Sequence, residues 1–185
     1  MEVNFNTNSK VYFTIVKKED IIKYNVDLKD ESESLIARYI LIKMLDYFDI
    51  ETPNIIISKN GKPYFEDSNI FFNYSHSKKY IACGISNYEL GIDIEETDRI
   101  ISDNLSKKYL NGVIDNKKRI EQWVKKEAYS KMKGLGLLMD FKKLNLDELS
   151  INNKFAENKD YMYSIFCNGD VIFKELRFDG AKWYE

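Results

Sequence analysis

The 185-residue sequence has only two cysteines and one histidine, and these low counts exclude several kinds of site. Cys83 and Cys167 each lie inside an apolar run, so we expect two buried thiols in separate strands. Because there is no C-x-x-C pair and no Cys/His cluster, a zinc site is not expected. No apolar run approaches the roughly 20 residues that span a bilayer, and residues 1–6 lack a signal-peptide pattern. We therefore expect a cytoplasmic protein without a membrane partner.

The net charge is small, but its distribution along the chain is uneven. A formal charge of −2 argues against general binding of nucleic acids. Residues 105–145 carry eleven lysines and arginines against four acidic residues, so this segment is strongly basic in an otherwise acidic chain. A basic segment of this kind suits an acidic partner or an anionic ligand. From charge alone, a solvated helix surface explains the pattern equally well.

Apolar periodicity predicts a folded protein with two long helices. Helical spacing extends over residues 34–48, and a second helix is expected over residues 116–133, ending at Gly134. A shorter helix is expected over residues 104–110, and a turn over residues 152–159. The predicted strands cover residues 10–16, 55–57, 69–75, 79–86, 90–96, 141–150, 161–167 and 170–178.

The order of these elements predicts an α+β fold with a pseudo-two-fold duplication. Residues 1–86 contain a strand, a long helix and three strands, and residues 87–185 contain a strand, helices and three strands. We expect each half to be a three- to four-stranded, largely antiparallel sheet packed on a long helix. The two halves would form one compact pseudo-dimeric unit with the site at their junction, where clefts commonly bind ligands. Because one chain supplies both halves, we expect a monomer.

Two carboxylates lie at this junction, in the stretch Leu90-Gly91-Ile92-Asp93-Ile94-Glu95-Glu96. Successive side chains of a strand point to opposite faces, so Asp93 and Glu95 share one face of this strand. Neighbouring carboxylates repel each other unless a hard cation such as Mg2+ lies between them. Acidic pairs are also common on exposed strand faces, so the pair alone leaves both interpretations open.

The second long helix carries three residues at a spacing of four: Trp123, Glu127 and Lys131. This spacing places them along one stripe of the helix. Glu127 can then complete a three-carboxylate site with Asp93 and Glu95, and Lys131 can reach a phosphate. The alternative is an ordinary Glu–Lys helical pair, worth a few tenths of a kcal/mol, beside a core tryptophan.

The histidine and one lysine are further candidates for binding phosphate. His76 follows Ser75 where a strand ends, and the imidazole and hydroxyl groups there can bind a phosphate. Lys62 lies in the turn Gly61-Lys62-Pro63 and can contact a phosphate as well. A lone histidine is more often structural or merely exposed, and the turn alone is only a turn.

Four short segments, considered together, resemble the signature set of a known family. They occur in the order Gly61-Lys62-Pro63, Phe72-Asn73-Tyr74-Ser75-His76-Ser77, Gly91-Ile92-Asp93-Ile94-Glu95 and Trp123-Val124-Lys125-Lys126-Glu127-Ala128-Tyr129-Ser130-Lys131. This set resembles that of the 4′-phosphopantetheinyl transferase superfamily, of the surfactin-synthetase-activating (Sfp) type. The resemblance covers residues 34 to about 138, because the start of the first long helix is also similar.

The resemblance implies an enzyme that transfers the 4′-phosphopantetheine arm of coenzyme A to a serine of an apo acyl or peptidyl carrier protein. The reaction would release 3′,5′-ADP. The family's metal is Mg2+, with Mn2+ as a possible substitute, and by similarity it would be held by Asp93, Glu95 and Glu127. The basic segment would suit an acidic carrier protein.

The same similarity implies roles for the phosphate-binding and catalytic residues. Lys131 would bind the phosphate and steady the departing 3′,5′-ADP, and Glu127 or a metal-bound water would take the proton from the carrier serine. The other coenzyme A phosphate contacts would come from Lys62, Ser75 and His76.

One departure from the family supports an alternative function. Many relatives carry a basic residue before the first-helix motif, which meets the 3′-phosphate, whereas this chain has Asp30-Glu31-Ser32-Glu33 there. Lys29 or Arg38 would have to replace this basic residue at the 3′-phosphate. At the metal site, Glu96 could offer an alternative ligand. The alternatives are a non-catalytic scaffold that binds a carrier protein or a nucleotide, and an unrelated Mg2+-dependent phosphohydrolase.

Overall fold

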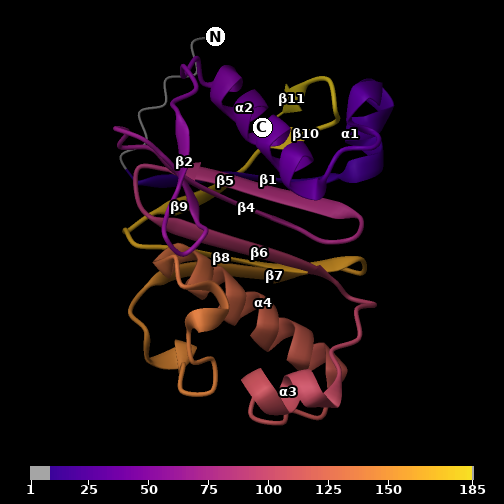
Figure 1. The fold of residues 1–185 in the computed structure, drawn as a ribbon, viewed down its shortest axis with the longest axis vertical. Coiled ribbons are helices and arrows are strands. Elements are labelled where there is room, and N and C mark those ends of the chain that lie inside the picture. Colours follow the sequence, from indigo (N-terminus) through magenta and orange to yellow (C-terminus); the bar gives the residue numbers. More distant parts are fainter. Residues whose placement is uncertain (1–8, 185) are drawn as a thin grey trace.

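The computed structural model describes residues 9–184 and shows four layers stacked as helix, sheet, sheet and helix (Figure 1). Helix α2 (Glu33–Tyr47) covers one outer face, and helix α4 (Asn116–Lys133) covers the other. Both helices begin at side-chain caps, since the Ser32 hydroxyl accepts a hydrogen bond from the Leu35 amide and Asp115 accepts one from the Lys118 amide. The α+β fold class is therefore confirmed.

The first sheet has the strand order β4-β5-β1-β9 and packs on α2. All its neighbouring pairs are antiparallel except β1 with β9, which is parallel. Its strands are β1 (Lys10–Lys17), β4 (Phe71–His76), β5 (Tyr80–Ser86) and β9 (Ile172–Glu175).

The second sheet has the order β6-β8-β7, is antiparallel throughout and packs on α4. Its strands are β6 (Leu90–Glu96), β7 (Asn152–Glu157) and β8 (Tyr161–Cys167). Ile92 and Ile94 of β6 point toward the first sheet, where they pack with Val11 and Phe13 of β1. Alternation along β6 therefore leaves Asp93 and Glu95 on the opposite face, as predicted.

Shorter elements lie between and beside these layers. On the side of the first sheet they are α1 (Lys18–Tyr24), η1 (Val26–Leu28), the hairpin β2 (Ile55–Ile57) and β3 (Pro63–Phe65), and the pair β10 (Arg177–Phe178) and β11 (Trp183–Tyr184). On the side of the second sheet they are α3 (Asp103–Tyr109), η2 (Gly136–Leu138) and η3 (Leu146–Glu148). No helix within residues 9–184 is both long and apolar enough to cross a membrane.

The predicted strand over residues 141–150 and the predicted turn over residues 152–159 are wrong. The first segment forms turns and η3, and β7 occupies most of the second. Asp140 and Asn145 explain the error, because their side chains accept hydrogen bonds from the amides of Lys142 (3.1 Å) and Asp147 (3.3 Å). Such local side-chain bonds compete with a strand ladder and favour turns.

The C-terminal segment returns to the first sheet. The predicted strand over residues 170–178 is divided into β9 and β10, and β9 pairs with β1 rather than with the second sheet. Helix α1 has no counterpart among the predicted elements. In both sheets the first strand of a set of three is followed in space by the last one, as the orders β1-β5-β4 and β6-β8-β7 show. The pseudo-two-fold relation and the division of the chain between residues 86 and 87 stay predictions.

Candidate active site

Strands β4 and β6 are edge strands of different sheets, and side chains of β4 and of the residue that follows it join them. Asn73, Ser75 and Ser77 are spaced two apart, so they point to the same side, toward β6. We call their three hydrogen bonds the polar seam: Asn73 Oδ1 accepts from the Ile92 amide (2.9 Å), Ser75 Oγ donates to Asp93 (2.8 Å) and Ser77 Oγ donates to Glu96 (2.8 Å).

The first bond of the polar seam gives a stability prediction. Replacing the buried Asn73 with alanine leaves the buried amide of Ile92 without its acceptor. We expect Asn73→Ala to lower the free energy of unfolding by about 1–3 kcal/mol, measured by urea denaturation. The control is Asn87→Ala, which removes only a longer, exposed bond to the Asn69 carbonyl (3.4 Å). Equal midpoints of urea unfolding for the two variants would show that the polar seam does not stabilise the junction of β4 with β6.

Helix α4 lies directly on β6 at Gly91. A Cβ atom at this glycine would overlap the Ala128 carbonyl oxygen and the Met132 amide, and would lie 2.9 Å from the Met132 Cα. Only a residue without a side chain permits this approach. It brings the stripe of α4 that carries Glu127 and Lys131 close to the carboxylates of β6.

Asp93 is the most buried of the three candidate carboxylates, with its side chain 5% exposed. Its Oδ1 atom accepts hydrogen bonds from Ser75 Oγ (2.8 Å) and Lys131 Nζ (2.6 Å). Lys131 Nζ also donates to Ser75 Oγ (2.7 Å), so the three side chains form a closed triangle. Asp93 Oδ2 is buried and makes no hydrogen bond in the structure, which is unusual for a charged oxygen.

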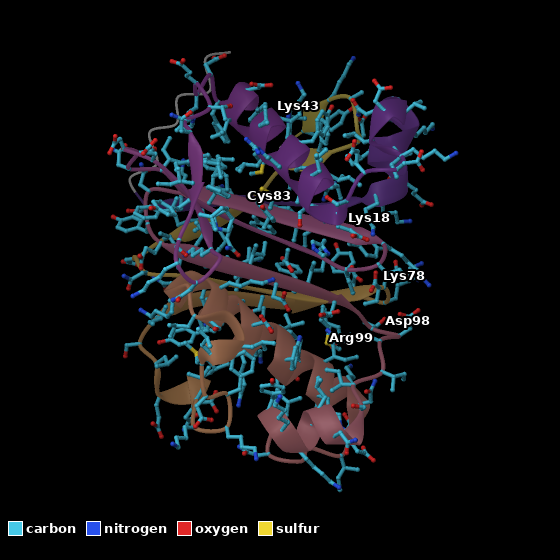
Figure 2. The ribbon with its side chains drawn as sticks, in the orientation of Figure 1. Lys18, Lys43, Lys78, Cys83, Asp98 and Arg99 are labelled. Atoms are coloured by element: carbon cyan, nitrogen blue, oxygen red, sulfur yellow. The ribbon has the colours of Figure 1, made fainter. Side chains whose placement is uncertain are left out.

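Glu95 pairs with Arg99, which lies on the segment after β6 (Figure 2). The guanidinium group of Arg99 also lies over the ring of Trp123, 5.3 Å from its centroid. The pKa of Glu95 is raised to about 7, first by burial and then by the charge of Asp93, while Arg99 acts in the opposite direction. The pKa of Glu127 is likewise raised, first by burial and then by Asp93.

A cavity of about 340 Å³ collects most of the predicted site residues. It lies where α4, β4 and β6 meet, so both sheets contribute to its wall. The lining residues are Tyr74, Ser75, His76, Asp93, Glu95, Arg99, Trp123, Glu127 and Lys131. The predicted stripe of Trp123, Glu127 and Lys131 therefore faces one cavity, although Trp123 also packs edge-on against Tyr109 and Phe141.

Lys62 lines a neighbouring cavity of about 200 Å³. The two cavities share Tyr74 and Lys131 as a common wall. Lys62 Nζ donates to the Met132 carbonyl (2.8 Å), and burial lowers the pKa of this lysine. Burial also lowers the pKa of His76 in the larger cavity. The structure thus brings all seven predicted residues to two adjoining cavities, while their individual roles stay predictions.

The carboxylates suit a divalent cation in chemistry, although they do not form a ready-made cluster. Among residues 9–184, no group of three His, Cys, Asp or Glu side chains is close enough to hold a metal ion. Glu95 is paired with Arg99, and Asp93 with Lys131. Carboxylate oxygens are nevertheless the ligands that Mg2+ prefers, and Asp93, which lines the cavity, has an Oδ2 atom without a hydrogen-bond partner. The residues present therefore fit a metal ion if these ion pairs rearrange.

Three neighbours of the site make contacts that the sequence alone does not predict. Arg99 lies in a loop, and only the fold places it beside Glu95. Asn73 belongs to a recognised motif, but its bond to Ile92 requires the two edge strands to meet. Glu33 of the acidic segment forms an ion pair with Lys18 (3.0 Å), which offsets part of its charge.

Comparison with known proteins identifies a relative of this chain. No protein-family model matches the chain. The chain is 33% identical over 147 residues to the 4′-phosphopantetheinyl transferase gsp of Aneurinibacillus migulanus. The alignment covers 71% of this chain, and the chain spans about 60% of the length of that relative. The chain is therefore related in sequence to the 4′-phosphopantetheinyl transferases, as its four motifs predict.

Proposed function

We propose that this protein is a Mg2+-dependent 4′-phosphopantetheinyl transferase that can also use Mn2+. It would transfer the arm of coenzyme A to a serine of an acyl or peptidyl carrier protein and release 3′,5′-ADP. The main support is the cavity that three carboxylates, a lysine and a histidine line together. The name of the relative supports the same activity. The acidic segment over residues 30–33 remains the support for the scaffold, whereas no observation on residues 9–184 favours the phosphohydrolase.

The site residues divide into a metal-binding set and a phosphate-binding set. Asp93, Glu95 and Glu127 would hold the Mg2+ ion, which when bound neutralises negative charge on the pyrophosphate. Lys131 lines the cavity, and its Nζ atom is held by Asp93 and Ser75; from this position it would bind a phosphate. The remaining phosphate contacts would come from Lys62, Ser75 and His76.

The transfer itself requires few groups from the protein, because positioning and charge neutralisation dominate phosphoryl transfer. The carrier serine Oγ would form a bond to the phosphorus that bears the pantetheine arm. The bond from that phosphorus to the bridging oxygen would break, and 3′,5′-ADP would leave with the electron pair. Glu127 would accept the serine proton, and Lys131 would stabilise the charge on the leaving phosphate.

The test is an intact-mass assay on a panel of apo acyl and peptidyl carrier proteins with coenzyme A and Mg2+. We expect the carriers that are substrates to gain the mass of one phosphopantetheine group, and EDTA or a carrier Ser→Ala variant to prevent the gain. An unchanged mass across the panel would contradict the proposed function. Calorimetry that shows carrier binding without coenzyme A binding would instead support the scaffold.

A further inference from the structure

Glu96 is a buried carboxylate next to the candidate metal ligands, but its hydrogen bonds go to another part of the chain. Its Oε1 atom accepts from Ser77 Oγ (2.8 Å) and from the Lys79 amide (2.6 Å). Its Oε2 atom accepts from the Lys78 amide (3.3 Å). All three donors belong to the turn between β4 and β5, so Glu96 ties this turn to the end of β6. The expected alternative role of Glu96 as a metal ligand does not match these contacts.

The same turn determines where His76 lies. Ser75 is bound to Asp93 and Ser77 is bound to Glu96, so both neighbours of His76 are fixed to β6. Alternation along β4 then directs the imidazole of His76 away from the seam, and it lines the larger cavity. Figure 2 shows Lys78 at the turn, above Asp98 and Arg99 on the segment after β6.

We propose that Glu96 is a positioning residue, whose carboxylate fixes the β4–β5 turn and thereby places Ser75 and His76 for binding the phosphates of coenzyme A. This inference rests on the proposed function. A carboxylate that accepts two backbone amides and a hydroxyl makes charge-assisted hydrogen bonds, which are stronger than neutral ones. Residues that support metal ligands in this way typically change metal affinity or activity by about 10- to 100-fold when they are mutated, and we expect an effect at the lower end of that range here.

The test compares Glu96→Ala, Glu96→Gln and the control Thr97→Val. Glutamine retains the Oε1 acceptor, whereas alanine removes both oxygens. Thr97 is adjacent on the chain, but its hydroxyl donates to the Lys159 carbonyl (2.8 Å) instead of binding the turn. We expect Glu96→Ala to weaken coenzyme A binding about 10-fold by calorimetry without a carrier. Glu96→Gln should recover most of this loss, and Thr97→Val should bind as the wild type does.

Enzyme kinetics separates positioning from stability. At a temperature where every variant is folded, Glu96→Ala should raise KM for coenzyme A and leave KM for the carrier unchanged. If Glu96 is merely structural, Glu96→Ala would lower the unfolding temperature and leave KM for coenzyme A and KM for the carrier unchanged. This result would overturn the inference. If Glu96→Ala does not fold, Ser77→Ala gives the answer, because it removes one donor of the same cluster and should weaken coenzyme A binding about threefold.

Measurements on the wild-type protein distinguish failure of the inference on Glu96 from failure of the proposed function. If the wild type transfers the arm but Glu96→Ala and Ser77→Ala both bind coenzyme A normally, the inference on Glu96 is wrong and the proposed function stands. If the wild type neither binds coenzyme A nor modifies any carrier, the proposed function is wrong and the inference falls with it.

Discussion

The Asp93→Asn variant is expected to lose transfer activity while keeping its fold. Asparagine has the same shape and retains an oxygen that can accept from Ser75 and Lys131, so the contacts of Oδ1 can persist. It lacks the negative charge, however, and its second polar atom is a donor in place of the unpartnered Oδ2. Loss of one preorganised electrostatic group typically lowers turnover by about 100-fold or more. The measurement is the rate of carrier modification by intact mass, with thermal unfolding recorded alongside.

A matched control for this variant is Asp98→Asn. Asp98 follows the same strand, but its side chain is 75% exposed and pairs with Lys79 at the edge of the molecule (Figure 2). Exposed pairs of this kind contribute little, so the control should modify carriers at the wild-type rate. If Asp93→Asn were equally active, Asp93 would not be a metal ligand.

The second large effect is expected at Gly91. Because a Cβ atom there would overlap backbone atoms of α4, no side-chain rotation can relieve the conflict, and β6 and α4 would have to separate. We expect Gly91→Ala to lower the free energy of unfolding by about 3 kcal/mol, at the upper end for overpacked cores. Urea denaturation measures this change.

Gly84→Ala is the comparison for Gly91→Ala. Gly84 lies in β5, and a Cβ atom there would lie 2.9 Å from Leu90 Cδ1, the far end of a flexible side chain. Rotation of Leu90 can make room, so this variant should lose clearly less stability. Similar losses at the two glycines would contradict the close approach of α4 to β6 on which the site depends.

The two long helices could be predicted well because their signals are local. Helix α4 begins and ends at the predicted residues, since Asp115 caps its start and Gly134 adopts the left-handed conformation after its end (φ 67°). The alternation of Ile92, Asp93 and Ile94 likewise follows from the strand period alone. These local rules also place Glu127 and Lys131 on one stripe of the helix.

Other features depend on contacts that the sequence does not display. The pairing of β9 with β1 joins residues far apart in the chain, and nothing in the run near residue 172 specifies that partner. The ion pair of Glu95 with Arg99 depends on the course of a loop. The motif that contains His76 indicates a phosphate site, but the contacts of Glu96 depend on the turn and β6 lying side by side.

The central claim is that a metal ion and the coenzyme A pyrophosphate meet in the cavity between α4, β4 and β6. Crystals grown with Mn2+ and coenzyme A, measured at the manganese absorption edge, test it most directly. We expect an anomalous peak in contact with Asp93, Glu95 and Glu127, and phosphates beside Lys131 and His76. A peak away from these carboxylates, or coenzyme A bound outside this cavity, would contradict the claim.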